Sequence, residues 1–251
     1  MMKKILTTFV SLAMLVPFVS AQDDEPKHLR FIPLGELPKL EELLPEGHLL
    51  FLEPPSGSMP PESVSLVSGD SVIPFELNLR VFTDILTMNG ATEGLGIKNG
   101  KTLESPFLLK APKPVAPLSL GVLYADPAKL LWKKPKMLLL KDDASAFPAS
   151  TVRFVNVSDK VVIVQLGGKG KRPFGIAAGG SSHKPFESGV TLIRVGYLTA
   201  DGSQKVIWQN QIKILSNQRV QCFFYKAVPS PGKDAVKFHY VTETIPKLPV
   251  K

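Results

Sequence analysis

The chain has 251 residues, of which 44% are hydrophobic, 23 are proline and one is cysteine. This hydrophobic content excludes a disordered chain, and the proline content, well above the usual ~5%, disfavours long helices and favours short strands joined by loops. The formal net charge is +8, but none of the basic and aromatic motifs of nucleic-acid-binding modules accompanies it, so we expect no nucleic-acid partner.

The first 21 residues are typical of a secretory signal peptide. Lys3 and Lys4 precede an apolar run from Ile5 to Phe18, and Val-Ser-Ala at 19–21 provides a cleavage site. This run is too short to remain in a membrane, and no later apolar run reaches the ~18 residues of a transmembrane helix. We therefore expect a mature protein that begins near Gln22 and is exported to the periplasm or beyond the cell, without a transmembrane segment after signal removal.

A single cysteine, Cys222, excludes an internal disulfide. In the run RVQCFFYK it shares strand parity with Val220 and Phe224, which indicates a buried side chain. The alternative is a reactive thiol or an intermolecular bridge.

Residues 28–143 are predicted to form a first β-sandwich module with a proline-rich insertion. It opens with a strand over 28–36, and a short helix is expected within residues 38–47, because Pro38 suits a helix start and Gly47 suits the position just past a helix end.

Further strands are expected in the middle of this module. The run from His48 to Leu52 is one, and VSLV at 64–67 leads through a Ser-Gly-Asp-Ser turn into the run 72–82. Apolar and polar residues alternate along that last run, which is typical of a half-buried antiparallel strand. The apolar set is Phe75, Leu77, Leu79 and Val81.

The module is expected to end in a hairpin and one more strand. Residues 118–123 alternate, Ala125-Asp126-Pro127 turns the chain, and Leu130-Leu131-Trp132 runs back, followed by a strand over 137–140. Residues 144–150 show no strong pattern and are interpreted as the link between modules.

Residues 150–242 are predicted to form a second β module, and residues 243–251 a tail. An Asp201-Gly202 turn between apolar runs strongly indicates a hairpin around it. From Val152 to Tyr225 the pattern resembles the immunoglobulin-type sandwiches of uncharacterised exported bacterial proteins. The resemblance implies a fold class and no functional residue. The fold class is thus all-β, with two tandem antiparallel β-sandwich modules and little helix.

The two modules look like copies of one unit. Residues 118–126 match 193–201, and the match ends with Trp132 opposite Trp208. A second match aligns LRFIPLGE from Leu29 with VRFVNVSD from Val152. The alternative is that short strands resemble one another because few residue types suit a pleated surface.

No motif in the chain carries recognisable chemistry. Gly100-Lys101-Thr102 ends like a phosphate-binding loop, but position 95 is leucine where that loop needs glycine. The four histidines are isolated, and no Gly-x-Ser-x-Gly motif is present. We therefore predict no catalytic, cofactor-binding or metal-binding residue. The candidate ligand-binding residues are Trp132 and Trp208, which stack a sugar if exposed and fill a core if buried.

Three functions stay open at this point. The leading hypothesis is an exported, non-enzymatic binding or scaffolding protein whose partner is an envelope or extracellular macromolecule, with an acidic polymer as one option given the basic charge. A carbohydrate-binding module pair and an unrecognised envelope hydrolase are the alternatives. The sequence favours a protein that is not an enzyme.

Overall fold

The computed structural model describes residues 26–249, except 39, 89–94, 103, 105, 127–128, 169, 187, 229 and 231. The predicted signal peptide lies outside these residues. Eighteen strands and no helix occur in the described part of the chain, and they form four four-stranded sheets and one hairpin. No helix there is long and apolar enough to cross a membrane.

The first module contains two sheets and the hairpin. Sheet A has the order β10-β9-β1-β6, with strands Lys136–Lys141, Leu118–Tyr124, Lys27–Leu34 and Leu86–Met88. Sheet C has the order β5-β4-β7-β8, with strands Ser71–Glu76, Ser63–Ser68, Gly96–Asn99 and Phe107–Lys110. The hairpin consists of β2 (Glu41–Leu43) and β3 (Leu49–Phe51).

The second module repeats this arrangement of two four-stranded sheets, without a counterpart of the separate β2–β3 hairpin among its described residues. Sheet D has the order β14-β11-β17-β18, with strands Ser181–Pro185, Thr151–Asn156, Gln218–Lys226 and Val236–Thr244. Sheet E has the order β13-β12-β15-β16, with strands Phe174–Ile176, Val162–Leu166, Gly189–Leu198 and Gln204–Ile214. All pairings are antiparallel except β1 with β9 and β11 with β17.

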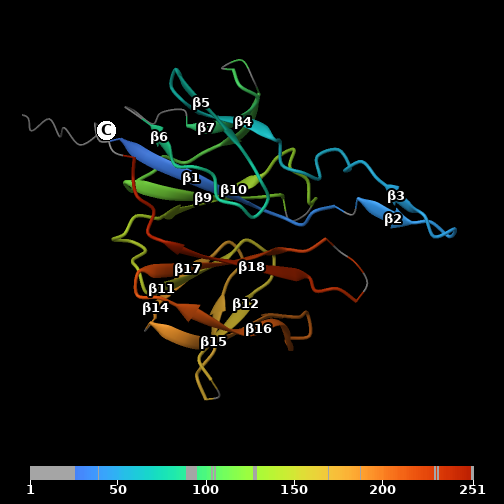
Figure 1. The fold of residues 1–251 in the computed structure, drawn as a ribbon, viewed down its shortest axis with the longest axis vertical. Helices are drawn as coiled ribbons and strands as arrows, with labels where there is room; N and C mark the ends of the chain where they lie inside the picture. The colour runs from blue at the N-terminus through green and yellow to red at the C-terminus, as the bar shows by residue number, and fades with distance from the viewer. Residues whose placement is uncertain are drawn as a thin grey trace, which may run out of the picture.

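The sheets stack in the order C, A, D, E from top to bottom of Figure 1. One apolar core lies between sheets C and A, and another between sheets D and E. A third core, which includes Ile32, Val122, Val155 and Phe223, joins sheets A and D. Because β1, β11 and β17 are covered on both faces, their side chains are buried at consecutive positions rather than alternate ones.

Each strand of the second module has a counterpart at the same place in the first. Strand β11 corresponds to β1, β17 to β9 and β18 to β10, and the parallel pairing next to the module's first strand recurs. The expected similarity of the two module starts, at Leu29 and Val152, agrees with this topology. Whether the modules arose by duplication stays a prediction.

The other sequence match is wrong. Residues 118–124 form β9, which lies beside β1 and corresponds to β17, whereas residues 193–198 belong to β15 in the opposite sheet. The expected partner strand at 130–132 does not form either, since Leu130 has a positive φ of 54° and β9 pairs with β10 instead. Trp132 and Trp208 are therefore not equivalent residues.

The helix expected over residues 38–47 is also wrong, because this segment forms β2 and the turn of the hairpin. Only a few residues separate Pro38 from Pro45, too few for a stable helix. The amide of Gly47 (φ 84°) donates to the Leu44 carbonyl, and the Leu44 amide donates to the His48 carbonyl, which closes a tight turn. By contrast, the hairpin around Asp201-Gly202 is confirmed as β15 and β16.

The alternating run 72–82 is a strand only as far as Glu76. Arg80 has a φ of 66°, and the Val81 amide donates to the Asn78 carbonyl, so the chain turns there. As a result Leu77 is buried, whereas Val81 is 55% exposed and does not share its environment.

Candidate functional sites at and beside the module interface

The interface between sheets A and D changes character along its length. One end is a buried network of charged side chains, the middle is the third apolar core, and the other end is an open cleft. Beside the cleft, the hairpin leaves the body of the protein (Figure 1). These three features are the network, the cleft and the arm, and each is described in turn.

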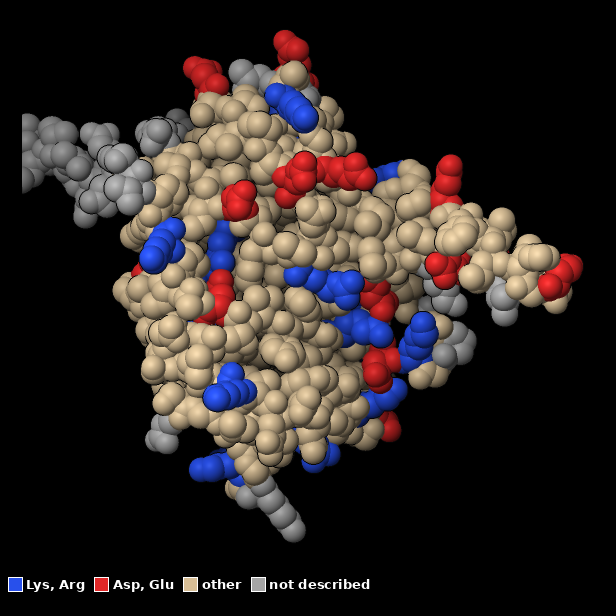
Figure 2. Space-filling model, viewed as in Figure 1, with Lys and Arg blue, Asp and Glu red and all other residues tan. Residues whose placement is uncertain are grey.

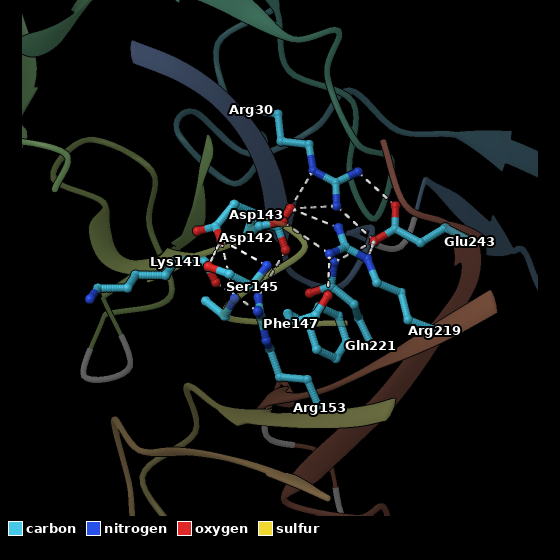
Figure 3. A network of polar contacts seen from close by, with 11 residues as sticks. Arg30, Lys141, Asp142, Asp143, Ser145, Phe147, Arg153, Arg219, Gln221 and Glu243 are labelled. Atoms are coloured by element: carbon cyan, nitrogen blue, oxygen red, sulfur yellow. Dashed lines mark hydrogen bonds and ion pairs between the residues drawn. The ribbon is translucent and has the colours of Figure 1, made fainter. Parts of the chain in front are cut away.

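The network centres on two carboxylates that bind arginines from both modules (Figure 3). Arg30 of β1 donates from Nε to Asp142 at 2.8 Å and makes two bonds of 2.7 Å to the carboxylate of Glu243 on β18. Arg153 of β11 donates to Asp142 at 3.0 Å. Each module therefore sends an arginine to the carboxylate of the other.

Arg219 on β17 completes the network from a fully buried position. Its Nε donates to Glu243 at 3.1 Å, and its Nη1 donates to the carbonyls of Asp142 and Phe147 at 2.9 and 2.8 Å. The guanidinium carbons of Arg153 and Arg219 lie 3.8 and 4.6 Å from the centre of the Phe147 ring. Phe147 thus anchors the link between the modules by cation–π contacts on a fully buried ring.

The contacts across the network are reciprocal. Arg30 and Arg153 occupy corresponding positions of β1 and β11, and the pairing registers place Asp142 and Glu243 at corresponding positions after β10 and near the end of β18. An arginine and a carboxylate of one module therefore meet the carboxylate and arginine of the other. This is the pattern of a two-fold symmetric dimer interface, here within one chain.

The charges in the network alter the pKa values of its members. Burial favours the neutral form of Glu243, but hydrogen bonds and positive charge from Arg30 outweigh it and hold the pKa of this carboxyl below its usual value. Burial lowers the pKa of Arg153 to about 10 despite the attraction of Asp142. Glu243 and Arg153 are therefore both charged at neutral pH.

The network is built to hold the modules together rather than to transform a substrate. Asp142 and Arg219 have no exposed surface, and their polar atoms are directed at one another and at backbone carbonyls. A substrate has no access to these groups. The network therefore holds sheets A and D together by electrostatic attraction between buried charged groups.

The cleft lies at the opposite end of the same interface and has a volume of about 530 Å³. Tyr124 of β9 lines it, together with two ion pairs, Lys136–Asp126 at 3.6 Å and Lys226–Asp159 at 2.8 Å. In Figure 2, basic and acidic side chains alternate at mid-height on the right, where the two modules meet. The two lysines and two aspartates that line the cleft neutralise one another in these ion pairs, so the cleft has no net charge.

The arm consists of residues 37–55 and contains the β2–β3 hairpin. Six large apolar side chains of the arm are exposed, with Phe51 at 73% and Leu49 at 56%. The others are Leu37, Leu40, Leu50 and Leu52. The link between β1 and β4 that holds the arm spans residues 35–62, whereas the corresponding link in the second module spans residues 157–161. The arm is thus an addition to the first module that neither sandwich core needs.

The two candidate tryptophans lie in different settings. Trp132 is 2% exposed and packs in the core of the first module, where its amide donates to the Gly57 carbonyl at 2.7 Å. Trp208 is half-buried on β16, with the rings of Phe238 and Tyr240 of β18 at 4.7 and 5.7 Å. The structure does not bring the two tryptophans together. Cys222 is fully buried, as expected, and burial raises the pKa of its thiol.

Sequence reasoning missed the network and the arm. Arg30 and Arg153 had one usable signal, an arginine between two apolar residues in each opening strand, as Leu-Arg-Phe at 29–31 and Val-Arg-Phe at 152–154. Glu243 falls in the predicted tail but lies in β18, and nothing in the sequence pairs it with a residue 213 positions away. The arm had a clear signal in its leucines and Phe51, which were interpreted as a helix and a strand of the first module without any expectation that they are exposed.

Comparisons with known proteins identify no family. No family model matches the chain, and no curated protein matches it. One similar solved structure is that of a "putative cell adhesion protein" from Bacteroides eggerthii, with 9% identity over 88% of this chain and 97% of that chain. Its TM-score is 0.22, so the likeness carries no argument about the fold or function of this chain.

Proposed function

We propose that this protein is an exported, non-enzymatic binding or scaffolding protein, and that the arm is the part that binds its partner. The observation that supports this most is the exposure of six large apolar side chains on one projecting segment. Water-exposed apolar groups cost free energy, and contiguous apolar patches on soluble proteins are usually interaction sites.

The rigid body of the protein suits this role. Two sandwiches joined by an apolar core and a network of ion pairs form a support with little freedom between its halves. An arm carried on such a support presents its apolar side chains at a fixed place, which limits the entropy lost on binding.

The test is affinity capture with the mature full chain and an extract of its own cell envelope. Three proteins are compared: wild type, the double variant Leu49→Ser/Phe51→Ser, and the control Val115→Ser. Val115 is 73% exposed and lies outside the arm, so it matches Phe51 in exposure. We expect a macromolecule that wild type and control retain and the double variant loses.

Equal capture by all three proteins would show that the arm is not the binding element. A hydrolytic activity that one carboxylate substitution abolishes would contradict the non-enzymatic function itself. Binding of an acidic polymer, the option suggested by the basic charge, stays a prediction and should involve the second module, which has a net positive charge, rather than the arm.

A carbohydrate-binding function is a second candidate, favoured by the aromatic cluster of Trp208, Phe238 and Tyr240. Tyr240 is 41% exposed, so one face of this cluster is open to a stacking ligand. In a Trp132→Phe variant, Trp208 is the sole tryptophan and reports directly on this site. A change in its fluorescence on addition of oligosaccharides, lost in Tyr240→Ala, would support this function, and no change would remove it.

A further inference from the structure

The arm and the second module carry opposite charge. Residues 37–55 contain four glutamates and one lysine, whereas residues 150–242 contain 13 lysines and arginines against four aspartates and glutamates. In Figure 2, Asp and Glu are seen on the projecting arm, and Lys and Arg predominate over the lower module. The molecule therefore combines an acidic arm with a basic second module.

The basic second module has one sheet face that no other sheet covers. Sheet E is the last layer of the stack, so one of its faces packs on sheet D and the other faces solvent (Figure 1). This outer face carries Val190, Leu192 and Arg194 from β15 beside Gln211 and Lys213 from β16, with Val190 opposite Lys213 in the register.

Apolar and basic groups are interleaved on this outer face. Val190 is 61% exposed, Arg194 and Lys213 are exposed, and Leu192 is half-buried between them. The arm has the matching composition, since exposed Phe51 and Leu50 of β3 pair in the register with exposed Glu41 and Glu42 of β2. Apolar area can thus be buried on both surfaces while opposite charges meet at the rim.

We propose that the arm of one copy of this protein docks on the outer face of sheet E of a second copy. The inference rests on the proposed function of the arm and names its partner as the same protein. Charge complementarity favours this occupant, because every copy of the protein carries a basic face that matches the acidic arm.

This contact joins copies head to tail. In one molecule the arm leaves the body at the level of the interface between sheets A and D, and the outer face of sheet E lies at the lower end of the stack (Figure 1). Two different surfaces therefore meet, and each docked copy leaves one arm and one face free. Repetition of such a contact builds an open filament of copies unless the geometry closes a ring.

The experiment uses two variants of the mature chain that each lose one side of the contact. The arm variant is Glu41→Lys/Glu42→Lys/Phe51→Ser, and the face variant is Val190→Ser/Arg194→Glu/Lys213→Glu. The control is Glu76→Lys, an exposed reversal on β5 of the body. Thermal unfolding verifies that each protein is folded, and sedimentation velocity measures mass against concentration.

We expect wild type and control to form species of two or more copies, and each variant alone to be monomeric. Mixed in equal amounts, the two variants should form a dimer and nothing larger, because an intact arm meets an intact face only once. Raising the salt to about 1 M, where the Debye length falls to ~3 Å, should weaken wild-type association by at least about tenfold.

Monomeric wild type at about 0.5 mM would overturn the inference, since a weaker contact has too little free energy to be specific. Association that survives in both variants would overturn it as well. If a triple variant does not fold, the single changes Phe51→Ser and Lys213→Glu replace it and should each reduce the associated fraction. Monomeric protein whose arm still captures another macromolecule would refute this inference and leave the proposed function standing.

Discussion

Asp142 is surrounded by the guanidinium groups of Arg30, Arg153 and Arg219, yet it carries a single negative charge and no exposed surface. Together with Glu243 it offsets much of the positive charge in the network. At the scale of residues, therefore, the interface between the modules depends on two carboxylates more than on any one arginine.

The variant Asp142→Ala should lower the free energy of unfolding by about 3–5 kcal/mol, because it leaves buried guanidinium groups without their counter-charge. Urea unfolding at neutral pH measures the loss. The exposed Glu62→Ala serves as a control for removing a carboxylate from the surface and should leave the midpoint unchanged. A loss for Asp142→Ala as small as the control's would show that the network contributes little.

The stability should also depend on pH through Glu243. Its pKa in the folded protein lies below the usual 4.5, so the unfolded chain binds this proton more tightly than the folded protein does. The resulting stabilisation is complete above the unfolded pKa and is lost as pH falls through the folded pKa. Glu243→Gln should be less stable at neutral pH and show a flatter decline below pH 4.5, as measured by urea unfolding across the acid range. A decline as steep as that of wild type would assign the pH dependence to other groups.

At the scale of elements, the long β15–β16 hairpin contains one irregularity. The register between these strands shifts at Val195/Gly196, and a β-carbon at Gly196 would collide with the backbone of Lys205 on β16. Backbone atoms in a paired strand cannot move aside as a side chain can. Glycine at this position is therefore needed for the close approach of the two strands.

Gly196→Ala should consequently lower the free energy of unfolding by about 1–3 kcal/mol. Gly168→Ala is the matched control, since a β-carbon there would meet no atom within 4 Å. The difference in thermal midpoint between the two variants checks the prediction. Equal midpoints would mean that β16 can move away from the added methyl group without loss of stability.

At the scale of the whole molecule, the apolar core between sheets A and D couples the two sandwiches. Phe223 is fully buried there, and the centre of its ring lies 6.3 Å from that of Phe82 in an edge-to-face contact. Each sandwich has its own core as well, so the coupling between them depends on the third core and on the network.

Each module carries one tryptophan, which gives a separate probe of its unfolding. Trp132→Phe leaves Trp208 to report on the second module, and Trp208→Phe leaves Trp132 to report on the first. We expect both single-tryptophan proteins to show the same urea midpoint as far-UV circular dichroism. Adding Phe223→Ala, which removes about 3–5 kcal/mol of packing, should separate the two midpoints. Midpoints that differ without this change would show that the modules unfold independently.

The sequence by itself determined the fold class, because strand alternation, proline content and the Asp201-Gly202 turn are local properties of the chain. Local pattern also predicted the buried Cys222, from its apolar neighbours on one strand. It failed at residues 38–47 and at 130–132, where leucine-rich segments fit more than one structure and only the partners available in space decide between them.

Only the tertiary structure decided how the two sandwiches meet. Arg30 and Glu243 lie 213 positions apart, and no local property of either residue shows that they pair. The order of strands in a sheet likewise depends on which sheets share a core. That order shows that β9 corresponds to β17 and that Trp132 and Trp208 lie at unrelated places in the two modules. The arm was decided in the same way: its leucines would suit a core, but the cores of both sandwiches are filled without them, and they are left exposed.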